Sequence, residues 1–426
     1  MRALFISANT ERINVPTMPL GLACVAEATR RAGHEIFLVD LMAESDPGDK
    51  IRRVIADFRP EIIGISIRNV DDQDMAKPRF LVDRARGVVI RCRQYASAPI
   101  VLGGAGYSIF PSSTLEYLGA DMGIQGEGEG TFPLLMERLQ QGRSFSTLPG
   151  LFQKGRGASK GTGCGFERNL DRFPMPHRDL LATEGYEKES LWLPLQTRRG
   201  CPMQCSYCST ETIEGRLIRK RSPGHVVAWL SDCVDAGFHR FHFVDNTFNM
   251  PPSYARELCA RIIEASLNIQ WRCILYPCRV DAALVRDMAR AGCREASLGF
   301  ESGSEPILTA FNKRFSLEDI RHASRLMRDH GIERMGFLLL GGPGETKETV
   351  LESLQFLDSL SLESNKLTMG VRIYPYTELA RIAREEGIVG ERDDLFFPRF
   401  YMAPGLYGWL KKTVDAWAKD RPNWMT

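Results

Sequence analysis

The sequence predicts an α/β protein with a doubly wound, Rossmann-like domain first and a partial (β/α)6 barrel second, and three observations predict it. Over residues 1–140, short apolar runs alternate with amphipathic helical patterns. A stretch rich in Gly and Pro follows over 141–190, and the alternation then resumes at a longer period. Continuous apolar strands separated by helices are typical of parallel sheets that helices cover on both faces.

The first domain is expected over residues 1–140. Its first apolar run is followed by a helical pattern that ends at Gly33, and further apolar runs come later. These runs are short, which suits strands rather than helices. The expected strands are 3–6, 36–39, 62–67, 100–102 and 122–124, and the expected first helix is 20–31.

Residues 141–190 are expected to connect the two domains, because Gly and Pro are frequent there and periodicity is weak. The barrel is expected over 191–375, with six strand–helix units instead of eight, and a short extension over 376–426. In such barrels the chemistry collects at the carboxyl ends of the strands. The expected barrel strands are 191–196, 240–244, 269–275, 295–300, 335–340 and 367–373, with helices at 253–265 and 317–330 among them.

The chain of 426 residues has a formal net charge of +2, with 43% hydrophobic and 25% charged residues. This balance gives no global attraction to nucleic acid or anionic membranes, and the basic run from Arg216 to Arg221 is more often a solvated loop. No apolar run is long enough to span a membrane, and the N-terminus lacks the apolar core of a signal peptide. The 11 scattered cysteines do not suit a disulfide scaffold, so we expect a reducing cytoplasm.

Three cysteines lie in one short loop that directly follows the first expected barrel strand. Cys201, Cys205 and Cys208 have the spacing C-x3-C-x2-C. Closely spaced thiolates in a loop hold iron–sulfur clusters, and a full set is four, so three leave one iron open. A zinc site is the alternative, but structural zinc usually takes two C-x2-C pairs, and His225 and Cys233 form no such pair. The spacing therefore favours a [4Fe–4S] cluster with a position open to a substrate.

This spacing, with the aromatic Tyr207 before the last cysteine, resembles the signature of the radical S-adenosylmethionine (SAM) superfamily. The resemblance implies that the open iron binds the amino and carboxylate groups of SAM, and that SAM is cleaved to a 5′-deoxyadenosyl radical. It also implies a low-potential electron donor of the flavodoxin or ferredoxin type, because this cleavage needs the low end of the range of cluster potentials.

Other expected strand ends carry residues that match this family. Asp245 and Asn246 end the second barrel strand and are expected to accept hydrogen bonds from the ammonium of SAM, with a helix cap as the alternative. Arg279 follows the third strand and is expected to pair with the SAM carboxylate or with Glu301, since a guanidinium suits bidentate contacts. The alternative for Arg279 is a solvated surface side chain.

The fourth and fifth strands complete the expected SAM site. Side chains alternate along a strand, so Ser297 and Glu301 share one face, which is small and polar. The pattern Gly-Phe-Glu-Ser-Gly-Ser over residues 299–304, which contains Glu301 and Ser302, resembles the ribose-side motif of the family. Gly341 and Gly342 follow the fifth strand, where the family places a loop against the adenine ring. Glycines after a strand let the backbone approach a ligand closely, although tight strand–helix turns need glycine anyway.

The first domain lacks the motifs of the common nucleotide sites. No G-x-G-x-x-G follows the first strand and no P-loop occurs, so NAD and ATP are not expected. Glycines instead follow the fourth and fifth strands, and this arrangement resembles the cobalamin-binding domain that precedes the barrel in one branch of radical SAM enzymes. The expected cobalamin contacts are Gly103, Gly104, Gly126, Glu127 and Gly128.

The cobalt ligand of other corrinoid domains is missing, because the motif D-x-H-x-x-G does not occur. His34 opens a strand and is expected to be structural. Cobalamin is therefore expected to bind with its lower face free or only approached by side chains. Arg68 and Asn69, at the end of the third strand, are the candidates for that face, and a solvent-facing polar loop is the alternative.

The resemblance implies a cobalamin-dependent radical SAM enzyme that methylates an unactivated carbon of a small molecule or a lipid. Two alternatives remain open: an enzyme with the same cofactors that catalyses a cyclisation or rearrangement, and a non-catalytic corrinoid- or metal-binding protein. The segment 374–377 has tyrosine where the family usually has glycine, so the last-strand loop is expected to be reshaped toward the substrate. The sequence identifies neither the substrate nor the oligomeric state.

Overall fold

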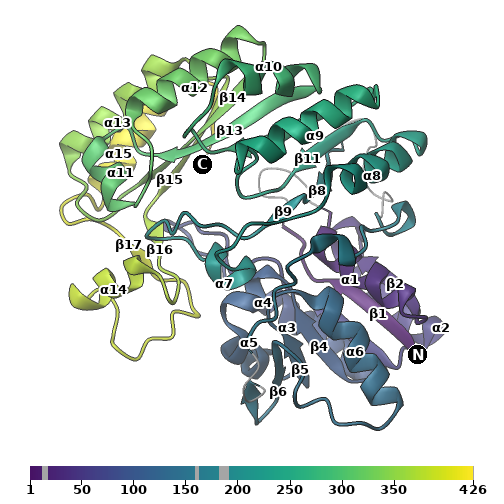
Figure 1. Ribbon diagram of the computed structural model, residues 1–426. Helices are drawn as coiled ribbons and strands as arrows, with labels where there is room; N and C mark the ends of the chain where they lie inside the picture. The colour runs from purple at the N-terminus through teal and green to yellow at the C-terminus, as the bar shows by residue number, and fades with distance from the viewer. Residues whose placement is uncertain (12–17, 159–162, 182–190, 426) are drawn as a thin grey trace. The chain divides into compact units, whose positions relative to one another are not determined.

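The computed structural model describes residues 1–11, 18–158, 163–181 and 191–425 (Figure 1). The chain divides into two compact units, which we call the N-terminal unit and the barrel unit. The N-terminal unit consists of Met1–Asp72, Arg79–Leu191 and Thr212–Gly215, and the barrel unit consists of Gln73–Pro78, Trp192–Glu211 and Arg216–Thr426.

The N-terminal unit is built on a seven-stranded sheet in the order β2-β1-β3-β4-β5-β6-β7. The first five strands pair in parallel, and the strand order reverses at β1, as in doubly wound sheets. All five lie within one residue of their expected bounds, so the doubly wound fold is confirmed. The strands are β1 (Arg2–Ser7), β2 (Glu35–Asp40), β3 (Ile62–Ser66), β4 (Ile100–Gly103) and β5 (Met122–Ile124).

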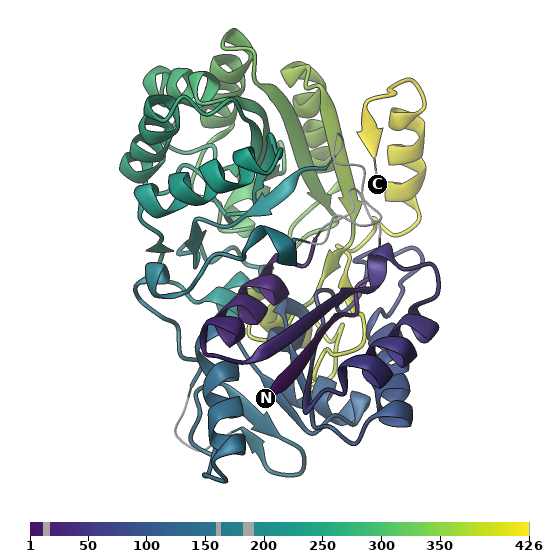
Figure 2. The ribbon, with the colours of Figure 1, turned by 90° about the vertical axis from the view of Figure 1, so that its right-hand side faces the viewer.

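Helices cover both faces of this sheet. Helix α1 packs on α6 and α2 packs on α3, and the two pairs lie on opposite faces (Figure 2). Phe5 of β1 meets Phe132 of α6 with ring centroids 5.0 Å apart, in a core that also buries Ala23 of α1. The helices are α1 (Leu20–Arg31), α2 (Pro47–Phe58), α3 (Val82–Tyr95), α4 (Ala105–Ile109), α5 (Pro111–Leu118) and α6 (Gly128–Gln140).

The expected connection over 141–190 is wrong in part, because the structure adds it to the N-terminal unit. Strands β6 (Leu151–Gln153) and β7 (Gly157–Ala158) extend the sheet in antiparallel fashion. Leu148, Leu151 and Leu180 are buried in the same core as α6. Strands of two or three residues between glycines leave no period in the sequence, which is why the stretch resembled a linker. Residues 159–162 and 182–190 lie outside the described residues.

The barrel unit contains a second seven-stranded sheet, in the order β18-β15-β14-β13-β12-β11-β8, with all neighbours parallel. Six strands correspond to the expected ones. The sixth begins earlier than expected and ends before Gly370, which has a left-handed φ of 78°. The strands are β8 (Leu193–Leu195), β11 (Arg240–Phe243), β12 (Gln270–Leu275), β13 (Cys293–Glu301), β14 (Glu333–Leu340) and β15 (Ser364–Met369).

Helices cover the outer face of this open barrel (Figure 1). On β13, Ala296, Leu298 and Phe300 are fully buried against these helices, while the alternating residues face inward and are half-buried. Capping boxes start α12 and α13, at Ser316 and Thr346. The helices are α8 (Pro223–Asp235), α9 (Pro252–Glu264), α10 (Ala282–Arg290), α11 (Glu305–Ala310), α12 (Leu317–Asp329) and α13 (Lys347–Leu360).

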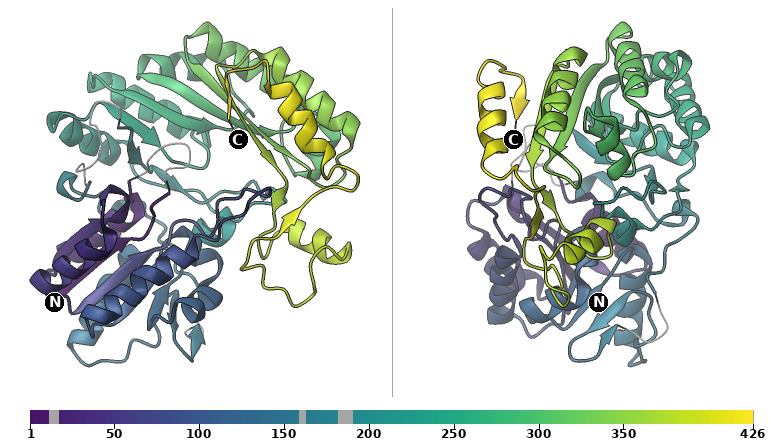
Figure 3. Two further views of the ribbon diagram at one scale, coloured as in Figure 1. Left: turned by 180° about the vertical axis from the view of Figure 1, so that it is seen from behind. Right: turned by 90° about the vertical axis from the view of Figure 1, so that its left-hand side faces the viewer.

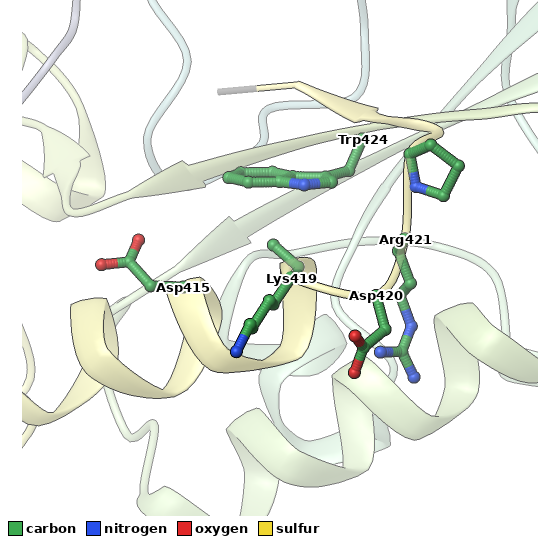
Figure 4. Close-up of a pocket in the computed structure, with 7 residues that line it drawn as sticks. Asp415, Lys419, Asp420, Arg421 and Trp424 are labelled. Atoms are coloured by element: carbon green, nitrogen blue, oxygen red, sulfur yellow. The ribbon is translucent and has the colours of Figure 1, made fainter.

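The C-terminal extension completes the barrel sheet instead of standing apart from it. The last strand, β18 (Trp424–Met425), pairs with β15 at Asn365, near the amino end of that strand (Figure 3). A hollow of about 600 Å³ lies there between α15 (Trp409–Ala418) and β18, with Trp424 and Lys419 on its sides (Figure 4). This hollow is at the opposite edge from the strand ends that carry the expected site. Three shorter elements are β16 (Val371–Arg372), α14 (Glu378–Glu385) and β17 (Phe400–Tyr401).

Candidate functional site

The cysteine loop lies at the carboxyl edge of the barrel sheet, directly after β8 and β9 (Arg198–Arg199). The side chains of Cys201, Cys205 and Cys208 are all half-buried. The backbone N–H of Cys208 donates to the carbonyl of Cys205 (3.1 Å), and Gln204 adopts a left-handed φ of 54°. These features turn the loop back on itself, so that three thiols are presented from one short segment.

The residues that follow α11 bind the backbone of this loop through hydrogen bonds. The backbone N–H of Ser206 donates to the carbonyl of Phe311 (3.1 Å). The side-chain amide of Asn312 donates to the carbonyls of Gln204 (2.7 Å) and Met203 (3.3 Å). The loop conformation is thus fixed by the protein itself, as a preorganised ligand site requires.

The thiols fit a cluster better than a single ion. A zinc ion would draw its thiolates into one tetrahedron at about 2.3 Å from the metal, whereas each iron of a cluster takes a thiolate of its own. Within the ranges that the structure describes, no three His, Cys, Asp or Glu side chains are grouped to hold one metal ion. Three spaced thiols on one loop are the donor set that a [4Fe–4S] cluster with an open iron needs.

Asp245, at the end of β11, anchors the base of the loop. It is fully buried, and its Oδ1 accepts the backbone N–H groups of Thr197 (2.7 Å) and Arg198 (2.9 Å). Its Oδ2 accepts the hydroxyl of Thr197 (2.6 Å) and the guanidinium of Arg198 (3.1 Å). Because protein donors occupy both oxygens, the structure speaks against the expected contact of Asp245 with SAM. The half-buried Asn246 beside it remains the candidate.

Glu301 ends β13 and faces the inside of the barrel. Its side chain is 16% exposed and its φ is left-handed, at 69°. Its ion-pair partner is Lys313 (3.4 Å) and not Arg279, which corrects one of the two expected pairings of Arg279. Arg279 is exposed, as the solvated alternative expects. Lys313 also donates to the phenol oxygen of Tyr207 (3.0 Å), so the pair is joined to the cysteine loop.

The two serines that are expected beside SAM lie in different places. Ser297 is half-buried on the inner face of β13, where its Oγ is 3.8 Å from Sδ of Met335. Ser302 is fully buried and turned toward α13, where its Oγ is 3.1 Å from Oγ of Ser353. Ser302 also accepts the backbone N–H of Ser304 (3.1 Å). It therefore ties β13 to α13, which corrects its expected role at the ribose, while Ser297 remains a candidate.

The glycine pair after β14 is required by packing. A Cβ on Gly342 would lie 2.4 Å from Cζ of Phe311, and one on Gly341 would lie 2.7 Å from Sδ of Met402. Both backbone N–H groups donate to Oε2 of Glu345, whose Oε1 is buried and has no hydrogen-bond partner among the described residues. Burial raises the pKa of Glu345 to about 7, against the opposing effect of the two N–H donors. Glu345 thus fixes the turn that the adenine ring is expected to contact.

A cavity of about 250 Å³ opens on the inner face of the barrel unit. Tyr207 and Glu301 line it, together with inward-facing residues of β14 and β15. Gln73, from the short N-terminal segment that belongs to the barrel unit, also lines it and donates to the phenol of Tyr374 (3.0 Å). Tyr374 lies in the loop that departs from the family pattern, while Tyr376 of the same loop is 89% exposed. One of the two unusual tyrosines therefore faces the cavity that holds the expected SAM residues.

At the carboxyl edge of the N-terminal sheet, the expected cobalamin glycines allow close packing. A Cβ on Gly104, whose φ is 99°, would lie 2.5 Å from the carbonyl oxygen of Ile67. A Cβ on Gly128 would lie 2.9 Å from Cγ2 of Val25. Gly103 is less confined, with its nearest neighbour 3.9 Å away. Two of these glycines thus serve the fold directly, and their backbone can still face a ligand.

The turn after β5 is tied to the described part of the following segment. Gly126 donates its N–H to Oγ of Ser108 (2.9 Å). Glu127 is buried and accepts the backbone N–H of Glu167 (2.8 Å). The carboxylate of Glu127 therefore orders the chain beyond α6, whatever it contributes to a ligand.

Arg68 and Asn69 follow β3 at the same edge of the N-terminal sheet. Arg68 is exposed and Asn69 is half-buried. His34 precedes β2 and thus lies at the other edge, where its Nδ1 is 3.4 Å from the N-terminal amine of Met1. This placement agrees with a structural histidine, because parallel strands put the starts and the ends of strands at opposite edges.

The structure adds residues that sequence reasoning missed. Lys313, Asn312 and Glu345 make direct contacts with the expected site. Lys313 and Asn312 lie more than 100 positions after the loop that they hold, and no spacing rule connects them. Glu345 gave a weak signal, since a carboxylate soon after two glycines is placed to accept their N–H groups.

Comparisons with known proteins agree with this geometry. The family model described as the Radical SAM superfamily matches residues 195–357, and the one described as the B12 binding domain matches residues 6–136. The chain belongs to the cobalamin-dependent radical SAM enzymes. An uncharacterized methyltransferase of Pyrococcus horikoshii is 28% identical over 365 residues, covering 85% of this chain and 77% of that protein. The tryptophan 2-C-methyltransferase of Streptomyces laurentii is 24% identical over 455 residues, covering 89% of this chain and 74% of that protein.

A solved structure of the radical SAM methyltransferase TsrM from Kitasatospora setae, with tryptophan and a SAM analogue bound, has the same fold. The TM-score is 0.88 at 23% identity, and the likeness covers 100% of this chain and 90% of that one. As a cobalamin-dependent radical SAM enzyme, the chain uses a [4Fe–4S] cluster, SAM and cobalamin. Among the described helices, none combines the length and the apolar character needed to cross a bilayer.

Proposed function

We propose that this cobalamin-dependent radical SAM enzyme transfers a methyl group to an unactivated carbon of a small molecule or a lipid. The observation that carries the proposal is the joint presence of a B12-binding domain and a radical SAM domain, matched at 6–136 and 195–357. The two relatives in Pyrococcus and Streptomyces are both named methyltransferases, and one is named for tryptophan.

The residues of the barrel unit hold SAM beside the cluster in this proposal. When bound, the cofactors supply the electron-transfer, radical and methyl-carrier chemistry, and the protein supplies placement. The half-buried amide of Asn246 is suited to accept a hydrogen bond from the SAM ammonium, and Glu301 is suited to accept from the ribose hydroxyls. The cluster ligands are Cys201, Cys205 and Cys208, and the further SAM contacts are Tyr207, Ser297, Gly341 and Gly342.

The N-terminal unit binds cobalamin in this proposal. Its turns after β4 and β5 approach the corrin through backbone at Gly103, Gly104 and Gly126 to Gly128, and Arg68 and Asn69 approach the lower face. No histidine follows a strand at that edge in a D-x-H-x-x-G motif, so the cobalt has no expected protein ligand. The enzyme is proposed to work in the cytoplasm, with a flavodoxin or ferredoxin as its electron donor.

The experiment is a product analysis of the full chain. The protein is reconstituted anaerobically with iron and sulfide, supplied with cobalamin, SAM and a low-potential reductant, and its adenosyl products are quantified by mass spectrometry. Methyl transfer predicts both 5′-deoxyadenosine and S-adenosylhomocysteine. Cys205→Ala is expected to abolish the 5′-deoxyadenosine, because the cluster loses one of its three ligands.

Two other outcomes point elsewhere. Deoxyadenosine without S-adenosylhomocysteine, with cobalamin demonstrably bound, indicates a cyclisation or rearrangement. No SAM cleavage from a fully loaded cluster under strong reductant indicates a non-catalytic corrinoid protein and contradicts the proposal.

A further inference from the structure

The barrel unit buries one ammonium group beside the cysteine loop. The side chain of Lys313 is 4% exposed, and its Nζ donates to the phenol oxygen of Tyr207 (3.0 Å) and to the carbonyl of Gly299 (3.1 Å). Its third contact is the carboxylate of Glu301, at 3.4 Å. Lysine is almost never buried to this extent unless it is paired, and these three contacts are the pairing that makes its burial possible here.

The chain around Lys313 fixes the ammonium next to the cluster ligands. The two residues before it, Phe311 and Asn312, bind the loop backbone, as described above. Tyr207 stands immediately before Cys208, and its ring packs edge-on against Phe311 with centroids 5.2 Å apart. The ammonium lies 5.5 Å from the centre of the Tyr207 ring. The contacts of Phe311 and Asn312 with the loop backbone, and of the Tyr207 ring with Phe311, therefore fix the position of the Lys313 ammonium relative to the cysteine loop.

The surroundings keep Lys313 charged and Glu301 oriented. Burial acts to lower the pKa of Lys313, but the neighbouring groups, Glu301 foremost among them, together outweigh this effect and the pKa is raised. Glu301 adopts a left-handed φ of 69°, a conformation that costs an ordinary residue about 1–3 kcal/mol and persists only where the surroundings fix it. The ion pair with Lys313 and a hydrogen bond with the Tyr207 phenol hold its carboxylate on the wall of the cavity.

We propose that Lys313 is a positioning residue of the redox site, whose ammonium makes the reduced cluster easier to form and holds Glu301 in the orientation that contacts SAM. A fixed positive charge in poorly solvated surroundings stabilises the state of a neighbouring centre that carries one more electron. Charges and hydrogen bonds around a cluster tune its potential in this way. The inference goes beyond the proposed function, because it concerns the cluster and SAM and holds for methyl transfer and cyclisation alike.

A purely structural tie predicts something different. If Lys313 only joined β13 to the loop, its replacement would reduce cluster loading or stability, but the loaded cluster would keep its potential. The charge-based account predicts a shift whose sign depends on which charge is removed. Loss of Lys313 and loss of Glu301 therefore act in opposite directions.

The test is a redox titration of the full chain, loaded with iron and sulfide and followed by the electron paramagnetic resonance of the reduced cluster. Lys313→Met is expected to shift the midpoint potential to more negative values, and Lys313→Arg to leave it near the wild-type value. Without SAM, Glu301→Gln is expected to shift it to more positive values. Lys412→Met, the same change on the exposed face of α15, is the matched control and leaves the potential unchanged.

SAM affinity, measured by equilibrium dialysis with the oxidised cluster, is the second readout. Lys313→Met is expected to weaken SAM binding about tenfold, the equivalent of one charge-assisted hydrogen bond. If Lys313→Met does not load a cluster, Lys313→Gln takes its place, since an amide retains donors for Tyr207 and Gly299. Unchanged potentials in both the Lys313 and the Glu301 variants overturn the inference. If the midpoint potentials shift as expected but the protein never yields S-adenosylhomocysteine, the role of Lys313 stands and only the proposed methyl transfer is contradicted.

Discussion

The carboxyl edges of the two sheets are built differently, although each is expected to bind a large cofactor. At the N-terminal sheet, glycines such as Gly104 and Gly128 lie against neighbouring chain, and the candidate cation Arg68 is exposed. At the barrel sheet, charged groups are buried in pairs, with Asp245 on Arg198 and Glu301 on Lys313. Close backbone suits the flat face of a large ring, whereas fixed buried charges suit a site where charge changes during the reaction.

The largest effect is expected where a buried ion pair is broken. Asp245→Ala leaves the buried guanidinium of Arg198 without its partner, so it is expected to destabilise the barrel unit by about 3–5 kcal/mol. Urea unfolding measures this change. Asp415→Ala, which removes the exposed partner of Lys411 on α15, is the matched control and is expected to cost less than about 1 kcal/mol. Equal costs for the two variants mean that the barrel edge does not depend on its buried charges.

The N-terminal edge is expected to respond to added volume instead. Gly104 has φ 99° and ψ 172°, a region that only glycine adopts readily, so Gly104→Ala is expected to cost about 1–3 kcal/mol, besides a Cβ contact of 2.5 Å with Ile67. Gly21→Ala in α1 is the control, since no atom lies within 4 Å of that Cβ, and it is expected to stabilise by about 0.5–1 kcal/mol. Urea unfolding compares both with the wild type. A neutral Gly104→Ala contradicts the close approach of β3 and β4 at this edge.

The stability of the barrel unit is also expected to depend on pH through a buried carboxyl group at its carboxyl edge. The pKa of Glu345 is raised from 4.5 in the reference state to about 7 in the folded state. The folded chain therefore holds a proton that the unfolded chain releases, and the stability due to this group falls between about pH 4.5 and 7.

Glu345→Gln is expected to remove this dependence while keeping an acceptor for the N–H groups of Gly341 and Gly342. Relative to the wild type, the variant should gain about 1–3 kcal/mol between pH 4.5 and pH 8. Unfolding curves at several pH values measure the difference. A constant difference across that range shows that Glu345 titrates normally.

The smallest effect on stability is expected at the exposed edge residue of the N-terminal unit. Arg68→Ala is expected to lower the free energy of unfolding by less than about 1 kcal/mol, because contacts of an exposed cation are worth little. It is expected to alter the visible absorption spectrum of bound cobalamin and to slow methylation, because the guanidinium is proposed to approach the lower face. An Arg68→Ala protein with an unchanged spectrum and rate assigns this residue to a solvent-facing loop.

What the sequence predicted well was local. The strands of both sheets and the cysteine loop are recognised from patterns that lie within about a dozen residues, and the structure contains them. The N-terminal domain boundary was placed too early, because β6 and β7 are too short to leave a period. Asp245 and Ser302 were expected at SAM, but their side chains bind the protein instead. Residue type at a strand end does not reveal which neighbour already occupies its oxygens.

The missed residues have a common reason. Lys313 and Asn312 reach the cysteine loop only because α11 returns the chain to it, after an interval of more than 100 residues. Contacts across such intervals depend on the packing of whole strand–helix units. They become visible in the structure and not in any local pattern of the sequence.

The loop of Cys201, Cys205 and Cys208 is proposed to hold a cluster whose open iron binds SAM. Electron paramagnetic resonance of the reduced, reconstituted protein tests it most directly, with and without SAM. We expect a [4Fe–4S] signal whose g-values shift when SAM is added, and we expect Cys205→Ala to lose this signal. A signal that SAM does not change, in a protein with a full complement of iron, would contradict the claim.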